Sequence, residues 1–263
     1  MDPIIKDDGR FKYLEIGDGP VLVLLHGLFG ALSNFEGLVK YFSKRFKVVV
    51  PLLPIFEMPI KEVSLGGLLK YIKEFVSYKG YENVHVLGNS LGGHIALLYT
   101  LDSPERVKSV TLTGSSGLFE NSLGRTFPKR GDYQFIKKKT EDTFYDPKVA
   151  TKALVDEVFD IVNDRNKALR VLYTARSALR HNVRERLSKI KVPTLLIWGK
   201  QDTVTPPFVG EEFNKHIENS ELVLIDKCGH APMMEDPNAF NEALEKFLEK
   251  VATTPDKEPV NPA

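Results

Sequence analysis

Several features that would restrict the function of this chain are nearly absent from its 263 residues. Cys228 is the only cysteine, so no disulfide can form within the chain and a reducing compartment is expected. Lys and Arg (36) almost balance Asp and Glu (35), and a net charge of +1 gives no overall attraction to nucleic acid or to a membrane surface. The apolar run "VLVLL" at 21–25 is far too short to span a bilayer. The segment 1–17 lacks a basic stretch followed by an apolar run, so no signal peptide is expected. We therefore expect a cytoplasmic protein that neither binds nucleic acid nor inserts into a membrane.

Strand-like and helix-like segments alternate along most of the chain. Several of the strand-like runs are continuous in Val, Ile and Leu, which is typical of strands that are covered on both faces. The predicted strands are Phe11–Glu15, Val21–Leu25, Lys47–Val50, Val84–Leu87, Val107–Leu112, Thr194–Trp198 and Leu222–Ile225. The predicted helices between them are Asn34–Phe42, Leu65–Tyr78, Leu91–Leu101, Val209–Ile217 and Asn238–Val251. This alternation predicts an α/β fold with a mostly parallel sheet flanked by helices.

One region interrupts the alternation. Residues 119–189 show helical periodicity, at 148–162 and 166–179 for example, but no convincing strand. We interpret this region as a helical cap inserted into a core formed by residues 1–118 and 190–252. The last residues, 253–263, are rich in proline and polar side chains and are expected to be disordered.

The stretch "VLGNSLGG" at 86–93 places Ser90 between glycines, where a predicted strand meets a predicted helix. Each glycine adds backbone entropy that is lost on folding, so glycine is expected here only if a side chain would not fit in this turn. A strand, then G-x-S-x-G, then a helix is the context of a nucleophile elbow. Such a turn exposes the serine hydroxyl at the carboxyl edge of the sheet, beside the positive end of a helix.

Two later loops supply the partners that a nucleophilic serine needs. Asp202 lies in "IWGKQDTVTP" (197–206) just after one predicted strand, and His230 lies in "VLIDKCGHAPMMEDP" (223–237) after the next. Earlier, "VLVLLHGLFG" (21–30) leads a strand into His26 and Gly27, where a backbone N–H can point at a reacting carbonyl oxygen. The chain order serine, aspartate, histidine is the order expected for these groups on an α/β-hydrolase sheet.

At these residues the sequence resembles the α/β-hydrolase superfamily, from "LLHGLFG" through "GNSLGG" to "CGHAPMMEDP". The resemblance implies that Ser90 is the nucleophile, that His230 is the general base and then acid, and that Asp202 orients the histidine. It also implies an oxyanion hole formed by the backbone N–H groups of Leu91 and Leu28, with Phe29 as an alternative to Leu28. No cofactor and no metal are implied.

Two departures from the relatives concern the substrate. The loop after the third predicted strand reads "VVVPLLPIFEMPIKEVSL", so pocket walls near Phe56 and Met58 cannot be transferred from relatives. Carbon–carbon bond hydrolases of the meta-cleavage group share the "GNS-x-GG" elbow, but they usually have tryptophan after the catalytic histidine, where this chain has Ala231. We therefore expect a carboxylesterase-like hydrolase that cleaves a small or medium ester through an acyl-enzyme. The alternatives are a carbon–carbon bond hydrolase and a ligand-binding or signalling protein on the same scaffold.

Other interpretations of the candidate residues stay open at this point. Ser90 could simply be the N-cap of the following helix, and Asp226 or Asp236 could orient the histidine instead of Asp202. The cap region carries 16 Lys and Arg against 10 Asp and Glu, so it is either a basic lid for anionic substrates or a solvated surface. The candidate substrate contacts are Phe29, Phe119, Arg176 and Arg180; the two arginines share a helix face by their spacing.

Overall fold

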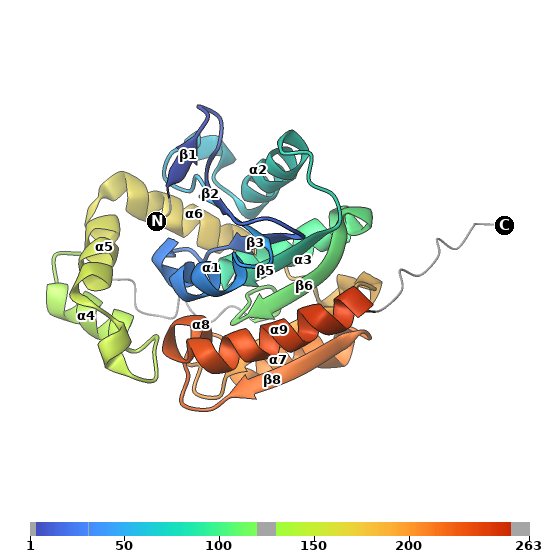
Figure 1. Ribbon diagram of the computed structural model, residues 1–263. Coiled ribbons are helices and arrows are strands. Elements are labelled where there is room, and N and C mark those ends of the chain that lie inside the picture. The colour runs from blue at the N-terminus through green and yellow to red at the C-terminus, as the bar shows by residue number, and fades with distance from the viewer. Residues whose placement is uncertain (1–3, 31, 120–129, 254–263) are drawn as a thin grey trace.

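A computed structural model describes residues 4–30, 32–119 and 130–253 of the chain. Its centre is an eight-stranded sheet in the order β1-β2-β4-β3-β5-β6-β7-β8 (Figure 1). The β1–β2 and β2–β4 pairs are antiparallel, and all other neighbouring strands are parallel. The strands are β1 (Ile5–Asp7), β2 (Lys12–Ile16), β3 (Val21–Leu25), β4 (Lys47–Pro51), β5 (Val84–Asn89), β6 (Val107–Thr113), β7 (Thr194–Gly199) and β8 (Ser220–Ile225).

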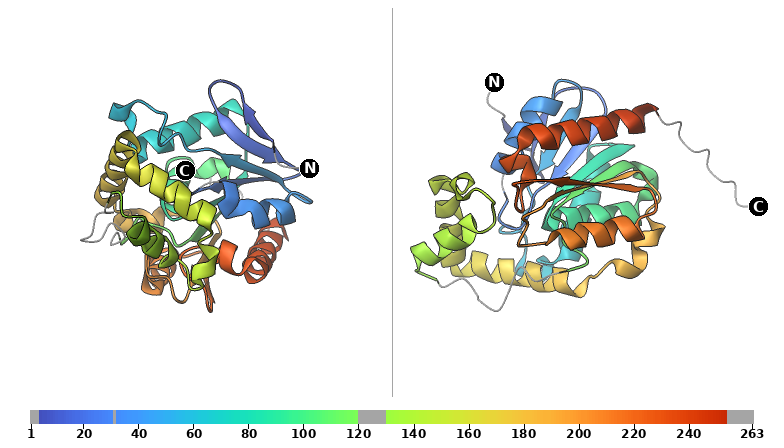
Figure 2. Two further views of the ribbon diagram at one scale, coloured as in Figure 1. Left: turned by 90° about the vertical axis from the view of Figure 1, so that its left-hand side faces the viewer. Right: turned by 90° about the horizontal axis from the view of Figure 1, so that it is seen from below.

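Helices cover both faces of the sheet and create two apolar cores. One core packs α2 and α3 with α7 against one face, and the other packs α1 and α9 against the opposite face. Figure 2 shows α9 and α7 on opposite sides of the sheet. The α-helices outside the cap are α1 (Glu36–Phe42), α2 (Leu65–Tyr78), α3 (Leu91–Asp102), α7 (Pro207–His216), α8 (Pro232–Glu235) and α9 (Pro237–Thr253). The short 3₁₀ helices are η1 (Leu32–Phe35), η2 (Ile60–Glu62), η3 (Pro104–Arg106), η4 (Pro147–Val149) and η5 (Arg184–Lys189).

The architecture confirms the α/β fold expected from the sequence. All seven predicted strands are present, and β5 and β7 are buried along their whole length, as their continuous apolar runs indicate. The sequence-based prediction missed β1, a three-residue strand whose residues are all exposed and therefore carry no apolar signal. It also missed α8, which has only four residues.

The described residues of the predicted cap region form three α-helices: α4 (Tyr133–Glu141), α5 (Lys152–Asn163) and α6 (Arg165–Arg180). Each begins at a side-chain cap, since Asp132, Thr151 and Asp164 accept hydrogen bonds from backbone N–H groups of the first turn. The three helices lie together at one end of the sheet (Figures 1 and 2). The division of the chain into core and cap stays a prediction. Part of the cap, 120–129, and the predicted disordered tail lie outside the described residues, apart from Thr253, the last residue of α9.

Helix α6 is attached to the core at several points. The Leu65 N–H at the start of α2 donates to the Ser177 hydroxyl at 3.0 Å, and the Arg170 guanidinium donates to the Met58 carbonyl. Beyond the helix end, the His181 carbonyl lies 2.8 Å from Nε2 of His94 on α3. The cap helix therefore rests on the same helix that follows Ser90.

Candidate active site

Ser90 occupies a strained turn between β5 and α3. Its φ of 54° and ψ of −117° are rarely adopted by residues with a side chain. A Cβ at Gly88 would lie 2.3 Å from the Gly92 carbonyl oxygen, and a Cβ at Gly92 would lie 1.9 Å from the Leu25 carbonyl oxygen. These collisions explain why the turn needs both glycines. The Ser90 side chain makes no capping hydrogen bond, so the interpretation as a simple helix cap is wrong.

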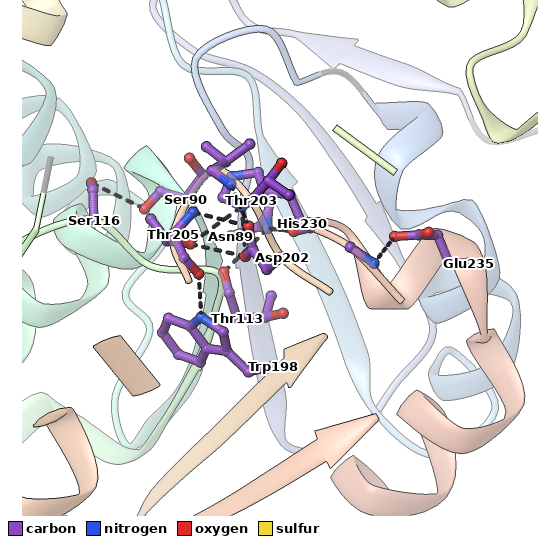
Figure 3. A network of polar contacts seen from close by, with 12 residues as sticks. Asn89, Ser90, Thr113, Ser116, Trp198, Asp202, Thr203, Thr205, His230 and Glu235 are labelled. Atoms are coloured by element: carbon purple, nitrogen blue, oxygen red, sulfur yellow. Dashed lines mark hydrogen bonds and ion pairs between the residues drawn. The ribbon is translucent and has the colours of Figure 1, made fainter. Parts of the chain in front are cut away.

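His230 and Asp202 form a buried pair close to this turn (Figure 3). Nδ1 of His230 lies 2.9 Å from Oδ2 of Asp202. Oδ1 of Asp202 accepts the N–H groups of Val204 and Thr205 at 2.8 and 2.9 Å, and the Thr205 hydroxyl donates to Oδ2 at 3.0 Å. An ionised carboxylate accepts a hydrogen bond from the imidazole nitrogen that it contacts, so Nδ1 of His230 carries the proton and Nε2 is left as the acceptor.

The two alternative carboxylates are engaged elsewhere. Asp226 is exposed and accepts a hydrogen bond from Gln201 Nε2 at 3.1 Å. Oδ1 of Asp236 accepts the Ala239 N–H at 3.0 Å near the start of α9. The geometry therefore favours Asp202 as the partner of His230.

His26 organises the glycine-rich loop that faces Ser90. Its Nε2 lies 3.0 Å from the Leu53 N–H and accepts it, so Nδ1 carries the proton and donates to the Gly27 carbonyl at 2.8 Å. Burial lowers the pKa of His26, which keeps the ring neutral in this arrangement. A Cβ at Gly27 would lie 3.3 Å from Cβ of Ser90, so this loop passes directly beside the serine.

A cavity of about 500 Å³ opens above these residues. Ser90, His230, Leu28, Phe29 and Leu91 all line it, so the structure brings the predicted serine, histidine and loop residues together. Asp202 does not line it, because it is buried behind the imidazole. The far walls come from the cap and are largely apolar: Ile136 of α4, Leu154, Val158 and Val162 of α5, and Val171, Leu172, Ala175, Ala178 and Leu179 of α6. This arrangement places an apolar compartment directly over a serine and a histidine.

Comparison with known proteins agrees with this geometry. Residues 20–144 and 162–237 match the family model described as the alpha/beta hydrolase fold. The chain belongs to this family. The chain is similar to a crystallised alpha/beta hydrolase enzyme, MGS-MChE2, from a lagoon-sediment metagenome. The two are 45% identical, and their structures superpose with a TM-score of 0.78 over 94% of this chain and 98% of the other.

Two curated relatives of this alpha/beta hydrolase have different named activities. A monoacylglycerol lipase of Xenopus laevis (abhd6-B) is 28% identical, over 94% of this chain and 82% of the relative. A 2-hydroxy-6-oxononadienedioate/2-hydroxy-6-oxononatrienedioate hydrolase of Pseudomonas putida is 29% identical, over 92% of both chains. These similarities confirm the identification made from the sequence motifs.

Three of the four substrate contacts predicted for this chain lie away from the cavity. Phe119 packs on Phe208, with ring centroids 5.2 Å apart, and is absent from the cavity wall. Arg176 and Arg180 are exposed, and Arg180 Nε donates to the Arg176 carbonyl. Helix α6 turns its small and apolar residues toward the cavity, which leaves the two arginines on the solvent side. The cations on the wall are Arg130 and Lys139 instead.

Sequence reasoning missed residues that support the histidine. Asn89 Nδ2 donates to the carbonyls of Thr113 at 3.1 Å and His230 at 3.2 Å, which ties the elbow to the histidine loop. Gly114, with a φ of 50°, packs so closely that a Cβ there would lie 2.8 Å from Nδ1 of His230. Asn89 stands within the recognised elbow motif and Thr205 stands three residues after Asp202, so both could have been found. Gly114 gives no local signal, because its contact is with a residue more than a hundred positions away.

Proposed function

We propose that this chain is a serine hydrolase that cleaves a small or medium ester, or a related acyl compound, through an acyl-enzyme. The observation that carries the proposal is the 2.9 Å contact between His230 and Asp202, made beside a strained Ser90 that opens into the same cavity. A serine becomes nucleophilic only when a base can take its proton, and a base is effective only when a third group orients it.

In the proposed reaction, Oγ of Ser90 attacks the ester carbonyl while Nε2 of His230 takes its proton. Asp202 stabilises the resulting imidazolium, and the N–H groups of Leu91 and Leu28 stabilise the oxyanion. His230 then returns the proton to the leaving alcohol, which departs and leaves an acyl group on Ser90. A water molecule, deprotonated by His230, releases the acid and restores the serine.

Other potential nucleophiles are poorly placed for this chemistry. Cys228 is fully buried, and burial raises the pKa of its thiol to about 12, so it carries negligible thiolate at neutral pH.

The apolar cap walls suit the hydrocarbon part of an acyl or alcohol group, and a cavity of about 500 Å³ fits a small or medium substrate. In the described part of the chain, no helix is both long and apolar enough to cross a membrane. The cytoplasmic location stays a prediction.

Carbon–carbon bond hydrolysis is the second candidate, because the Pseudomonas putida relative covers 92% of both chains and is named for substrates of that kind. We prefer ester cleavage because Ala231, and not a tryptophan, follows His230.

The test is turnover by the purified protein of short p-nitrophenyl esters and, in parallel, of a vinylogous 1,5-diketone acid. We expect ester hydrolysis that Ser90→Ala abolishes without loss of fold, since one hydroxyl contributes little to packing. Turnover of the diketone alone would support the second candidate. If the folded protein turns over neither compound, the ligand-binding interpretation replaces both.

A further inference from the structure

Glu235, the last residue of α8, connects two segments that are far apart in the sequence. One oxygen of its carboxylate, Oε1, accepts the Gly229 N–H at 2.7 Å (Figure 3). The other, Oε2, accepts the Tyr145 N–H at 2.6 Å. Gly229 directly precedes His230, whereas Tyr145 belongs to the segment that follows the cap helix α4. A single side chain thus holds the histidine loop and a turn of the cap.

The two segments also touch each other directly. The His230 N–H donates to the Thr143 carbonyl at 2.9 Å. A Cβ at Gly229 would lie 2.6 Å from the Thr143 carbonyl oxygen and 3.0 Å from Cα of Phe144. The backbone before His230 therefore packs directly against residues 143–145. We call residues 143–145 the α4 turn.

The α4 turn belongs to the wall of the cavity. Thr143 and Phe144 line it, as do Ile136, Lys139 and Thr140 of α4 itself. A shift of this turn would move part of the cavity wall and the backbone of His230 together.

The Glu235 carboxylate is engaged by backbone donors and not by a cation. Within the described residues, no Lys, Arg or His side chain forms an ion pair with it. Burial raises the pKa of Glu235, while hydrogen bonds from the backbone N–H groups of Tyr145, Gly229, Asp146 and Ala231 oppose that shift. A half-buried carboxylate without a counter-ion contributes little to stability through charge, so its hydrogen bonds to these two backbone segments are its main effect.

We infer that Glu235 is a positioning residue, which fixes His230 relative to Ser90 by clamping the histidine loop to the α4 turn of the cap. This inference rests on the proposed function, because His230 must act as the base for its position to matter. Its consequence is that the rate of the chemical step depends on how the cap is seated, and not only on the three catalytic side chains.

The first test is Glu235→Gln. The amide has the shape of the carboxylate but offers one acceptor oxygen, and its NH₂ group would face a backbone N–H. We expect kcat for a short p-nitrophenyl ester to fall on the order of 100-fold, as displacement of a catalytic group by about 1 Å can cause, with a much smaller change in KM. The matched control is Glu242→Gln on α9, an exposed glutamate whose partner is Lys246; it should leave kcat unchanged.

A merely structural role gives a different result. It would lower the melting temperature of Glu235→Gln but leave kcat per folded molecule at the wild-type value, and that outcome would overturn the inference. The proposed function is tested separately, by whether the wild-type protein turns over an ester and Ser90→Ala does not.

A second variant disrupts the same contact by changing the histidine loop instead of Glu235. Gly229→Ala leaves the carboxylate intact but pushes the histidine loop away from the α4 turn, and Gly229 does not have a positive φ that would itself disfavour alanine. We expect a comparable fall in kcat, and the double variant should be about as impaired as the worse single variant, since both break one contact. If the two reductions in kcat multiply in the double variant, the two substitutions act independently and the inference is wrong.

A measurement on the unaltered protein completes the test and does not depend on whether the variants fold. Hydrogen exchange at the amides of Gly229 and Tyr145 should be slow, because both N–H groups donate to Glu235. Fast exchange at either amide would overturn the inference.

Discussion

Oδ2 of Asp202 lies 2.9 Å from Nδ1 of His230, although the two residues are 28 positions apart and follow different strands, β7 and β8. These neighbouring parallel strands deliver both side chains to the same edge of the sheet. Because β7 also pairs with β6, and β6 with β5, the same edge carries Ser90 at the end of β5. The sheet topology therefore brings together three residues that the sequence separates by 140 positions.

Replacing Asp202 tests whether this carboxylate sets the tautomer of His230. Asp202→Asn should lower kcat for ester hydrolysis on the order of 10⁴-fold, since an amide can donate to Nδ1 and so place the ring proton on Nε2. Substrate binding, measured with the Ser90→Ala background to prevent turnover, should change much less. The control is Asp226→Asn, because Asp226 is exposed and contacts Gln201. If Asp226→Asn is damaging and Asp202→Asn is not, the carboxylate has been assigned wrongly.

The elbow and its partners could be predicted because their signals are local. A Cβ at Gly88 or Gly92 would lie within 2.3 Å of a backbone oxygen, so the turn requires glycine there, and each of Asp202 and His230 follows a recognisable apolar strand. The cavity wall could not be predicted in the same way. Spacing placed Arg176 and Arg180 on one helix face, but only the packing of α6 on the core decides which face meets the cavity.

Contacts between distant segments left no pattern in the sequence. Glu235 meets Tyr145 across 90 positions, and nothing in either neighbourhood indicates the other. Short exposed elements behaved similarly: β1 lacks the apolar alternation that would distinguish a strand from a loop, because all three of its residues face solvent.

Lys139 is the cation to test for selection of anionic substrates. It lines the cavity and, among the described residues, forms no ion pair, whereas Lys137 and Lys138 pair with Glu141 and Asp142. Lys139→Gln should raise KM for an ester with a terminal carboxylate by up to about fivefold, the equivalent of ~1 kcal/mol for an exposed ion pair. KM for a neutral ester of the same length should stay unchanged, and added salt should weaken the difference in the wild type.

Two matched variants show whether any effect of Lys139→Gln is local. Lys137→Gln removes a neighbouring charge from α4, and Arg176→Gln removes one from the solvent side of α6. Neither should alter the preference between the two esters. An equal loss of preference in all three variants would mean that the net charge of the cap, and not a contact in the cavity, selects the substrate.

Glu15 on β2 should make the fold sensitive to acid. Burial alone would raise its pKa, but hydrogen bonds from Lys79, Tyr81 and Lys6 outweigh burial and lower the pKa to about 2. Its ordinary value is 4.5, so the carboxylate stabilises the folded state fully above about pH 4.5 and loses that effect as the pH falls toward 2. Urea denaturation at several pH values should show that Glu15→Gln flattens this part of the dependence of the unfolding free energy on pH.

The control for that series is Glu36→Gln, at an exposed position of α1 with no ion pair among the described residues. Its pH dependence should follow that of the wild-type protein. Identical slopes for the wild type and Glu15→Gln between pH 4.5 and 2 would show that the hydrogen bonds at Glu15 do not persist in solution.

Labelling with a fluorophosphonate, followed by mass spectrometry of the proteolytic peptides, tests most directly whether Ser90 is an activated nucleophile. Only a serine with a working base reacts readily with this reagent, so the result does not depend on knowledge of the natural substrate. We predict a single adduct on the peptide that contains Ser90, lost in Ser90→Ala although that variant keeps the circular dichroism of the wild type. Undiminished labelling of Ser90→Ala, or an adduct on another residue, would contradict the account.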